Sequence, residues 1–197
     1  MDKVITISRE YGAGGHSIGR RVAQELGIEI YDRDIVRETV KASGFDAELV
    51  EREEEESSRS ATFFKNLLAS SAYYHDPQDA IHEVQQAVIL RFAQKGPCLI
   101  LGRCADEVLR RNGVPCLNVF LHASPIHRAA RVREITGVID PTEIQRIMTK
   151  KDLSRKNYYA HYTGRSWGDS HNYHLALDSG VLGYDRCVRM ILDAAKD

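Results

Sequence analysis

The stretch that decides the fold is Ser8-Arg9-Glu10-Tyr11-Gly12-Ala13-Gly14-Gly15-His16-Ser17. It follows a β-rich run at residues 3–8 and precedes an amphipathic helical run at residues 17–26, so it joins a strand to a helix. Three glycines within four residues allow consecutive backbone N–H groups to converge on an anion, and the helix N-terminus adds partial positive charge. The stretch therefore predicts a phosphate-binding loop; a tight turn without a ligand is the alternative.

One candidate for this loop is the dinucleotide fingerprint G-x-G-x-x-G. Gly12 and Gly14 match its first two glycines, whereas Ser17 stands at the third. Asp32, at the end of the second expected strand, would take the place of the acid that binds ribose. A Rossmann-type oxidoreductase therefore remains an alternative at this point.

The other candidate is the P-loop pattern G-x-x-x-x-G-K-[ST]. Gly15 and Ser17 match its second glycine and its hydroxyl residue, which can reach a phosphate or its Mg²⁺. Glu10 replaces the first glycine, and His16 replaces the lysine. Neither pattern is complete, so the rest of the chain has to distinguish them.

Beyond this loop, short apolar runs alternate with amphipathic ones. Further strands are expected at residues 28–31, 97–101, 116–121 and 174–177. Helices are expected at residues 34–43, 78–95, 105–111 and 183–195, and after the start signals Ser124-Pro125 and Asp140-Pro141. Five strands separated by helices predict a parallel sheet covered on both faces, which is a three-layer α/β domain.

Composition excludes several classes of protein. The 197 residues contain 27 Lys and Arg against 28 Asp and Glu, which disfavours a generally basic nucleic-acid binder. No apolar run reaches the ~18 residues of a membrane span, and no signal peptide is visible. The four cysteines form no C-x-x-C pair and are expected to be reduced thiols. We therefore expect one cytoplasmic domain that binds neither membrane nor nucleic acid; its oligomeric state cannot be inferred.

Two segments interrupt the alternation of strands and helices. The first, at about residues 45–76, contains an acidic run at residues 51–56 that is typical of a charged surface. The second, at about residues 149–167, is rich in Lys and Arg. It also contains four aromatic side chains that would either stack on a base or pack against the core: Tyr158, Tyr159, Tyr162 and Trp167.

Several segments together resemble the cytidylate-kinase-like proteins among the P-loop nucleoside monophosphate kinases. They are VITISREYGAGGHSIG, YDRDIV, LILGR, FLHASPIHRAARV, KKDLSRKNYY and W-x-x-x-x-x-Y-x-L-x-L-D-S, and they span nearly the whole chain. The resemblance implies a P-loop kinase fold with strand order 2-3-1-4-5 in a single domain. It also implies that residues 45–76 are the insertion that binds the nucleoside monophosphate and that residues 149–167 are a basic lid.

The resemblance further implies transfer of the ATP γ-phosphoryl group to a small molecule, a cytidylate-type nucleoside monophosphate, with Mg²⁺ as cofactor. The residues expected to wrap the ATP phosphates are Gly12, Ala13, Gly14, Gly15, His16 and Ser17. Ser17 is also expected to bind the Mg²⁺ ion. Those expected to bind the acceptor are Asp32, Arg37 and Arg103. No zinc site is expected among the eight histidines.

Phosphoryl transfer depends on positive charge around the transferring group. The resemblance makes Arg155 the leading catalytic cation, with Asp152 either orienting it or contacting the acceptor. His16 stands where related kinases have lysine, and either Arg9 or Arg20 could supply the missing charge. The same replacement motivates an alternative function, an ATP-binding regulatory module with weak or no turnover.

Overall fold

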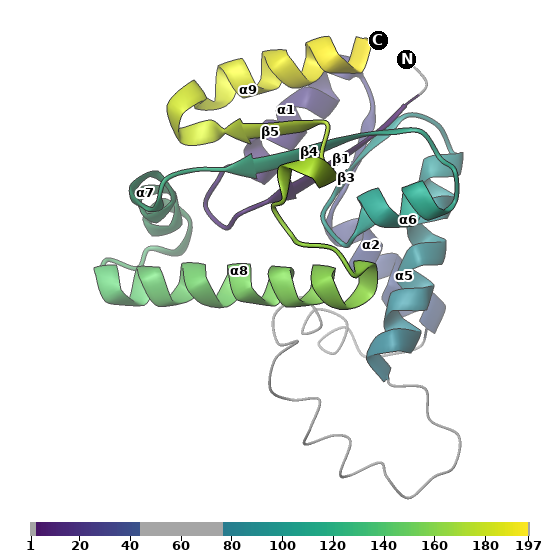
Figure 1. Cartoon of the computed structure of the whole chain (residues 1–197), viewed down its shortest axis with the longest axis horizontal. Coiled ribbons are helices and arrows are strands. Elements are labelled where there is room, and N and C mark those ends of the chain that lie inside the picture. The colour runs from purple at the N-terminus through teal and green to yellow at the C-terminus, as the bar shows by residue number, and fades with distance from the viewer. Residues whose placement is uncertain (1–2, 44–76, 197) are drawn as a thin grey trace, which may run out of the picture.

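The computed structural model describes residues 3–43 and 77–196, which form one five-stranded sheet with helices on both faces (Figure 1). In spatial order the strands are β2 (Glu29–Tyr31), β3 (Cys98–Leu101), β1 (Val4–Arg9), β4 (Cys116–His122) and β5 (Leu175–Asp178). Each neighbouring pair runs parallel. The structure thus confirms the three-layer α/β class and the strand order 2-3-1-4-5.

Two groups of helices cover the two faces of the sheet. Helices α1 (Gly15–Leu26) and α9 (Ser179–Lys196) share one apolar core with the sheet, whereas α5 (Pro77–Gln94) and α6 (Ala105–Arg111) share the other. Helix α2 (Arg33–Ser43) packs against α5. Side chains of a strand alternate between faces: Ile5 and Ile7 of β1 join the first core, and Val4 joins the second.

Three helices within the described residues remain outside these two groups. Of these, α7 (Pro125–Thr136) follows the carboxyl end of β4, whereas α8 (Pro141–Thr163) runs along the sheet as one long helix (Figure 1). The short η1 (Ser170–Asn172) directly precedes β5. The predicted start signals are confirmed, because Ser124 and Asp140 each accept a hydrogen bond from a backbone N–H of the first helical turn. Most of the segment expected to be a lid is therefore the second half of α8.

Element boundaries differ from the sequence prediction by a few residues. Helix α1 begins at Gly15, two residues before the expected start, because the glycine loop itself enters the helix. Helix α9 begins at Ser179 and not at Gly183, where the backbone is non-helical (φ 72°, ψ 159°) and the helix is kinked. The expected insertion at residues 45–76, with the acidic run at 51–56, lies outside the described residues.

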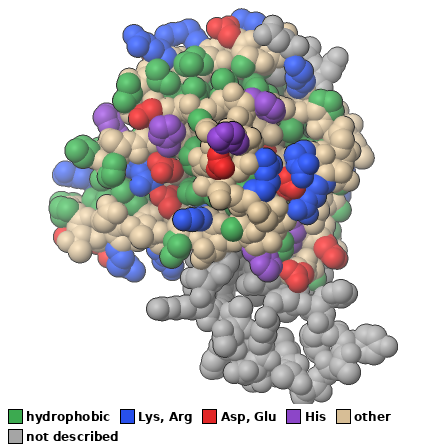
Figure 2. Space-filling view, viewed as in Figure 1, with side chains coloured by type: hydrophobic (Ala, Val, Ile, Leu, Met, Phe, Trp, Pro, Cys, Tyr) green, Lys and Arg blue, Asp and Glu red, His purple; other side chains and the backbone are tan. Residues whose placement is uncertain are grey.

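A group of arginines surrounds one buried carboxylate in α6. Glu107 is 2% exposed, and its carboxylate pairs with Arg110 at 2.7 Å, Arg111 at 2.7 Å and Arg165 at 3.3 Å. Figure 2 shows Lys and Arg side chains gathered over α6. The hydrogen bonds from Arg110, followed by those from Arg111, lower the pKa of Glu107 to about 2, although burial acts in the opposite direction.

Two further sequence expectations concern the cysteines and the membrane. Cys98, Cys104, Cys116 and Cys187 are free thiols, and burial raises the pKa of each one. None of the helices in the described part of the chain has the length and apolar character to cross a membrane.

Candidate active site

The loop between β1 and α1 has the backbone geometry that the glycines predict. Gly12 (φ 86°) and Gly14 (φ 78°) both adopt left-handed conformations. A side chain at Gly12 would also lie 2.7 Å from the carbonyl oxygen of Arg128. Gly14 is the N-cap of α1, where no side chain caps the helix and the first turn carries no acidic residue. The first-turn N–H groups of α1 are therefore suited to an anion.

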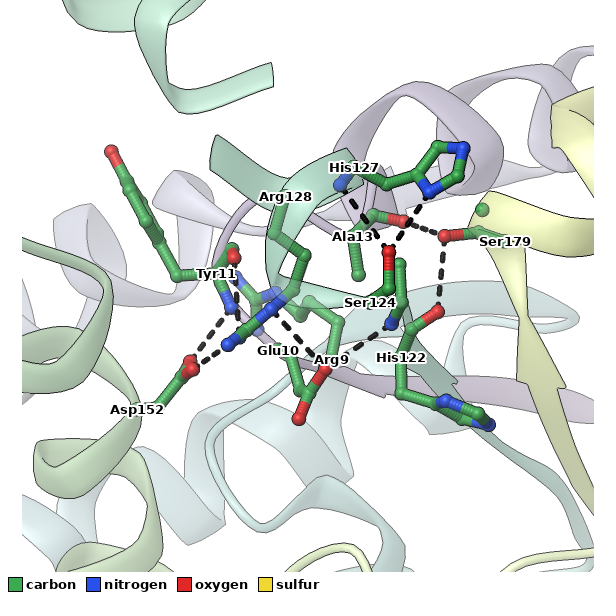
Figure 3. Close-up of polar contacts among 12 residues, drawn as sticks. Arg9, Glu10, Tyr11, Ala13, His122, Ser124, His127, Arg128, Asp152 and Ser179 are labelled. Atoms are coloured by element: carbon green, nitrogen blue, oxygen red, sulfur yellow. Dashed lines mark hydrogen bonds and ion pairs between the residues drawn. The ribbon is translucent and has the colours of Figure 1, made fainter. Parts of the chain in front are cut away.

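Helices α7 and α8 hold the beginning of this loop (Figure 3). The Asp152 carboxylate accepts the backbone N–H of Tyr11 at 2.7 Å and a second hydrogen bond from Arg128. Arg128 also lies 3.5 Å from the Glu10 carboxylate, which accepts the backbone N–H of Ala123 at 3.2 Å. Asp152, expected to orient Arg155 or contact the acceptor, holds the beginning of the glycine loop in this structure.

The start of α9 holds the other side of the loop. The Ser179 hydroxyl lies 2.8 Å from the carbonyl oxygen of Ala13 and 3.2 Å from that of His122, at the end of β4 (Figure 3). The Tyr184 ring covers Gly14 so closely that a Cβ at Gly14 would overlap it. Position 14 therefore requires glycine both for its backbone conformation and for this packing contact.

Ser17 and His16 lie in the first turn of α1. The Ser17 hydroxyl accepts a hydrogen bond from the Arg131 guanidinium of α7 at 3.2 Å, which brings an arginine to the phosphate loop. The side chain of His16 is exposed, and so is that of Arg20 on the same helix. Within residues 3–43 and 77–196, neither exposed side chain has a contact that would direct it toward a ligand.

Beside the loop is a pocket lined by three arginines, Arg9, Arg103 and Arg155, which come from the ends of β1 and β3 and from α8. The other lining residues are Ser8, Gly102, Cys104, Tyr158, Tyr159 and Trp167. In open α/β sheets ligands bind at the carboxyl ends of the strands. Arginine recognises phosphate through paired hydrogen bonds, so the lining is suited to a phosphorylated ligand.

The backbone at Arg103 is strained. Gly102 (φ 73°), Arg103 (φ 57°) and Cys104 (φ 55°) are consecutive left-handed residues between β3 and α6. Two of them are not glycine, and such conformations cost on the order of 1–3 kcal/mol each. Arg103 is only 6% exposed, so the fold keeps this arginine inside at an energetic cost. The sequence predicted Arg103 as a site residue but gave no sign of this conformation.

Arg155 reaches the pocket from α8. Its Nη1 donates to the carbonyl oxygen of Arg9 at 3.0 Å, and its guanidinium lies 5.6 Å from the centroid of the Tyr11 ring. Asp152, one helical turn earlier, binds the N–H of Tyr11. One face of α8 therefore carries both a cation of the pocket and the support of the phosphate loop.

The two acceptor residues expected near β2 behave differently. The Asp32 carboxylate lies 3.8 Å from the Arg9 guanidinium and so joins the edge of the pocket. The Arg37 guanidinium is exposed and pairs with Asp34, one turn earlier on the same helix. The structure thus brings Arg103 and Arg155 together in one pocket and places Asp32 against its third arginine, Arg9, whereas Arg37 forms a surface ion pair.

The aromatic residues of α8 pack against the core. The Tyr159 hydroxyl donates to Asp106 at 2.6 Å, and the Tyr158 hydroxyl donates to Gln85 at 2.9 Å. Tyr158 also lies 2.7 Å from Nδ1 of His82, and burial lowers the pKa of that histidine to about 4. These contacts join α8 to α5 and α6, and Tyr158 and Tyr159 are buried. They support the packing interpretation of these two rings, although one edge of each lines the pocket.

A parallel sheet of this order, with a glycine loop after its central strand, defines the chain as a P-loop kinase by fold. The family model described as "Cytidylate kinase-like family" matches residues 4–181, and the chain belongs to that family.

Solved structures share this fold. An uncharacterized protein from Eubacterium ventriosum ATCC 27560 is 25% identical, with a TM-score of 0.73 and 99% of each chain covered. A shikimate kinase from Bacteroides thetaiotaomicron is 12% identical (TM-score 0.57, 100% of each chain). A gluconokinase from Sinorhizobium meliloti 1021 is 16% identical (TM-score 0.55, 99% of this chain and 92% of the other). No curated protein matches the sequence.

Proposed function

We propose that the protein transfers the γ-phosphoryl group of ATP to a cytidylate-type nucleoside monophosphate. The observation that carries this proposal is the pocket lined by Arg9, Arg103 and Arg155 beside the glycine loop. Three guanidinium groups suit an acceptor that itself bears a phosphate, because they can bind it and also offset the charge of the transferring group. An acceptor with a single carboxylate, or with none, would leave this lining poorly matched.

For ATP, we propose that Gly12, Ala13, Gly14, Gly15, His16 and Ser17 wrap the phosphates. The left-handed glycines and the uncapped start of α1 support this assignment. The Ser17 hydroxyl accepts one hydrogen bond from Arg131, and its second lone pair fits a Mg²⁺ ion bound with ATP. Such an ion would neutralise charge on the phosphates.

Within the pocket, we propose that Arg103 binds the phosphate of the acceptor and that Arg155 faces the transferring group. Asp32 would contact the sugar or the base of the acceptor. Asp152 would hold the glycine loop through the backbone N–H of Tyr11, and would either orient Arg155 or contact the acceptor. Residues 45–76 would complete the acceptor side as part of the same domain.

A second function is favoured by one observation, the exposed histidine at the position of the P-loop lysine. On that basis the protein would be a regulatory module that binds ATP with weak or no turnover. The Rossmann alternative loses its support, because β3 lies between β1 and β2, whereas the Rossmann order places β2 directly beside β1.

The test is turnover with Mg²⁺–ATP and a panel of acceptors: CMP, dCMP, UMP, AMP, shikimate and gluconate. ADP release gives the rate, and ³¹P NMR identifies the product. We expect a nucleoside diphosphate from CMP or dCMP, with less from the other monophosphates. Transfer to shikimate or gluconate alone would contradict the acceptor class. Tight ATP binding without transfer to any acceptor would favour the regulatory module.

A further inference from the structure

The side chain of Arg9 follows a path that two glycines keep open. Arg9 is the last residue of β1, and its stem passes over Gly15 of the phosphate loop, where a Cβ would lie 2.6 Å from Cγ of the arginine. Its guanidinium then passes over Gly102 at the end of β3, where a Cβ would overlap Nη1. Any other residue at either position would have to displace the arginine. The loop that suits ATP and the turn that presents Arg103 are thus both shaped around Arg9.

The guanidinium of Arg9 lies between the two proposed substrate sites. It lines the pocket together with Arg103 and Arg155, while the stem contacts the loop assigned to the ATP phosphates. The Arg9 side chain is 14% exposed, so its charge is partly shielded from water and acts more strongly on a neighbouring anion. Its ion pair with Asp32 spans 3.8 Å, longer than a hydrogen bond, so a bound phosphate can compete for the guanidinium.

The other two side chains considered for the place of the missing lysine are less well positioned. His16 is exposed, and its imidazole is shorter than a lysine side chain. Arg20 is exposed one turn further along α1, and it does not line the arginine pocket. Arg9 alone among these three both touches the phosphate loop and lines the pocket.

We propose that Arg9 is a catalytic residue that supplies the charge usually supplied by the P-loop lysine; this inference rests on the proposed kinase function. An oxygen of the acceptor phosphate, attacking as the dianion, forms a bond to the γ-phosphorus of ATP. The bond from that phosphorus to the bridging oxygen breaks, and its electron pair leaves with ADP. Arg9 donates hydrogen bonds to the transferring group as negative charge spreads over its oxygens, and no proton transfer is needed.

The test compares Arg9→Met and Arg9→Lys with Arg20→Met as the matched control. Methionine keeps an unbranched stem over Gly15 but removes the charge, and the backbone carbonyl that accepts from Arg155 is unchanged. We expect Arg9→Met to lower kcat by about 10³–10⁵-fold, the effect of an arginine aimed at a transferring phosphoryl group. The Kd for ATP should change less than about threefold, and Arg9→Lys should recover at least about tenfold in kcat because the charge returns. Arg20→Met should match the wild type.

A second readout does not depend on the natural acceptor. Aluminium fluoride with ADP and Mg²⁺ imitates the transferring group, so the wild type should bind ADP more tightly in its presence. We expect Arg9→Met to lose this gain while its affinity for ADP alone is kept. If Arg9→Met loses affinity for ADP alone as strongly as it loses the gain with aluminium fluoride, Arg9 has a structural role and the proposal is overturned. Wild-type behaviour of Arg9→Met would also overturn it, and so would a large effect of Arg20→Met. If the wild type shows the gain through Arg9 but phosphorylates no acceptor in the panel, the proposed acceptor class fails and the role of Arg9 stands.

Discussion

The Asp152 carboxylate of α8 accepts the backbone N–H of Tyr11 at 2.7 Å, so the helix that carries Arg155 also holds the beginning of the glycine loop (Figure 3). The same carboxylate binds Arg128 of α7, whose backbone carbonyl limits position 12 to glycine. The conformation of the loop is therefore set by side chains far away in the sequence as well as by its own glycines.

The first prediction follows from this contact. Asp152→Ala leaves a backbone N–H and a largely buried guanidinium without their carboxylate, so the loop should lose its set conformation. We expect ATP affinity to fall about 10–100-fold, the range of one to two hydrogen bonds to a charged group. The ATP affinity of Asp152→Asn should fall less, because its amide oxygen can still accept the N–H of Tyr11. Isothermal titration calorimetry measures both, with Asp193→Asn in the exposed ion pair of α9 as control. Undiminished ATP binding by Asp152→Ala would show that the loop does not need this support.

The second prediction concerns His16. Lysine at this position has the reach and the fixed charge to follow a transferring phosphoryl group, and the exposed site leaves room for it. We expect His16→Lys to raise kcat with the best acceptor of the panel, by about tenfold if it adds one favourable charge contact. Steady-state kinetics measures this change. A lower kcat in a folded variant that still binds ATP would mean that the histidine itself is needed.

The third prediction concerns Glu107. Its folded-state pKa of about 2 lies below the ordinary value, so the stabilisation is complete above about pH 4.5 and is lost as pH falls through about 2. We expect Glu107→Gln to reduce the free energy of unfolding at pH 7 by about 1–3 kcal/mol. Urea denaturation at a series of pH values should show the two proteins converging as pH approaches 2. A difference in unfolding free energy that stays constant across this pH range would contradict an ionic origin of the stabilisation by Glu107.

The fourth prediction concerns His82, which burial keeps neutral with a pKa of about 4. An unfolded histidine titrates near pH 6.5, so the unfolded state binds more protons between these two values, and stability must fall as the solution is acidified from about pH 6.5 to 4. The total loss should approach about 3 kcal/mol. His82→Gln cannot titrate and should show a correspondingly flatter profile in denaturation experiments over this range. Parallel profiles of unfolding free energy against pH for the two proteins would mean that His82 has the same pKa in the folded and unfolded states.

The sequence predicted the fold well because its signals are local. Alternation of apolar runs, glycines after helices and the caps at Ser124 and Asp140 identified the elements, and the order of the strands followed from the resemblance. The first turn of α9 was missed because the non-helical backbone at Gly183 separates it from the amphipathic run expected at residues 183–195. Most of the segment expected to be a lid within the single domain lies in α8, and whether it acts as a lid stays a prediction.

The site was predicted in part. Residues in or beside the glycine loop, and Arg103 after a strand, could be found because strand ends carry ligands in this architecture. The support of the loop by Asp152, Arg128 and Ser179 could not be predicted from the sequence, because each contact joins residues more than 100 positions apart. The ion pair of Arg37 with Asp34, one helical turn away, was also not foreseen, and the expected contact of Arg37 with the acceptor stays a prediction. The catalytic and binding roles themselves stay predictions.

Helix α8 has a consequence for the entropy of substrate binding. Its 23 residues span roughly 34 Å without a break, with Tyr158 and Tyr159 buried against the core. Ordering a flexible segment costs about 1–2 kcal/mol of backbone entropy per residue. In this chain that cost is met when the protein folds and not when a nucleotide arrives, because Arg155 stands on a helix that is already formed. Under the proposed function, binding energy that a flexible lid would consume would instead hold the two substrates in line.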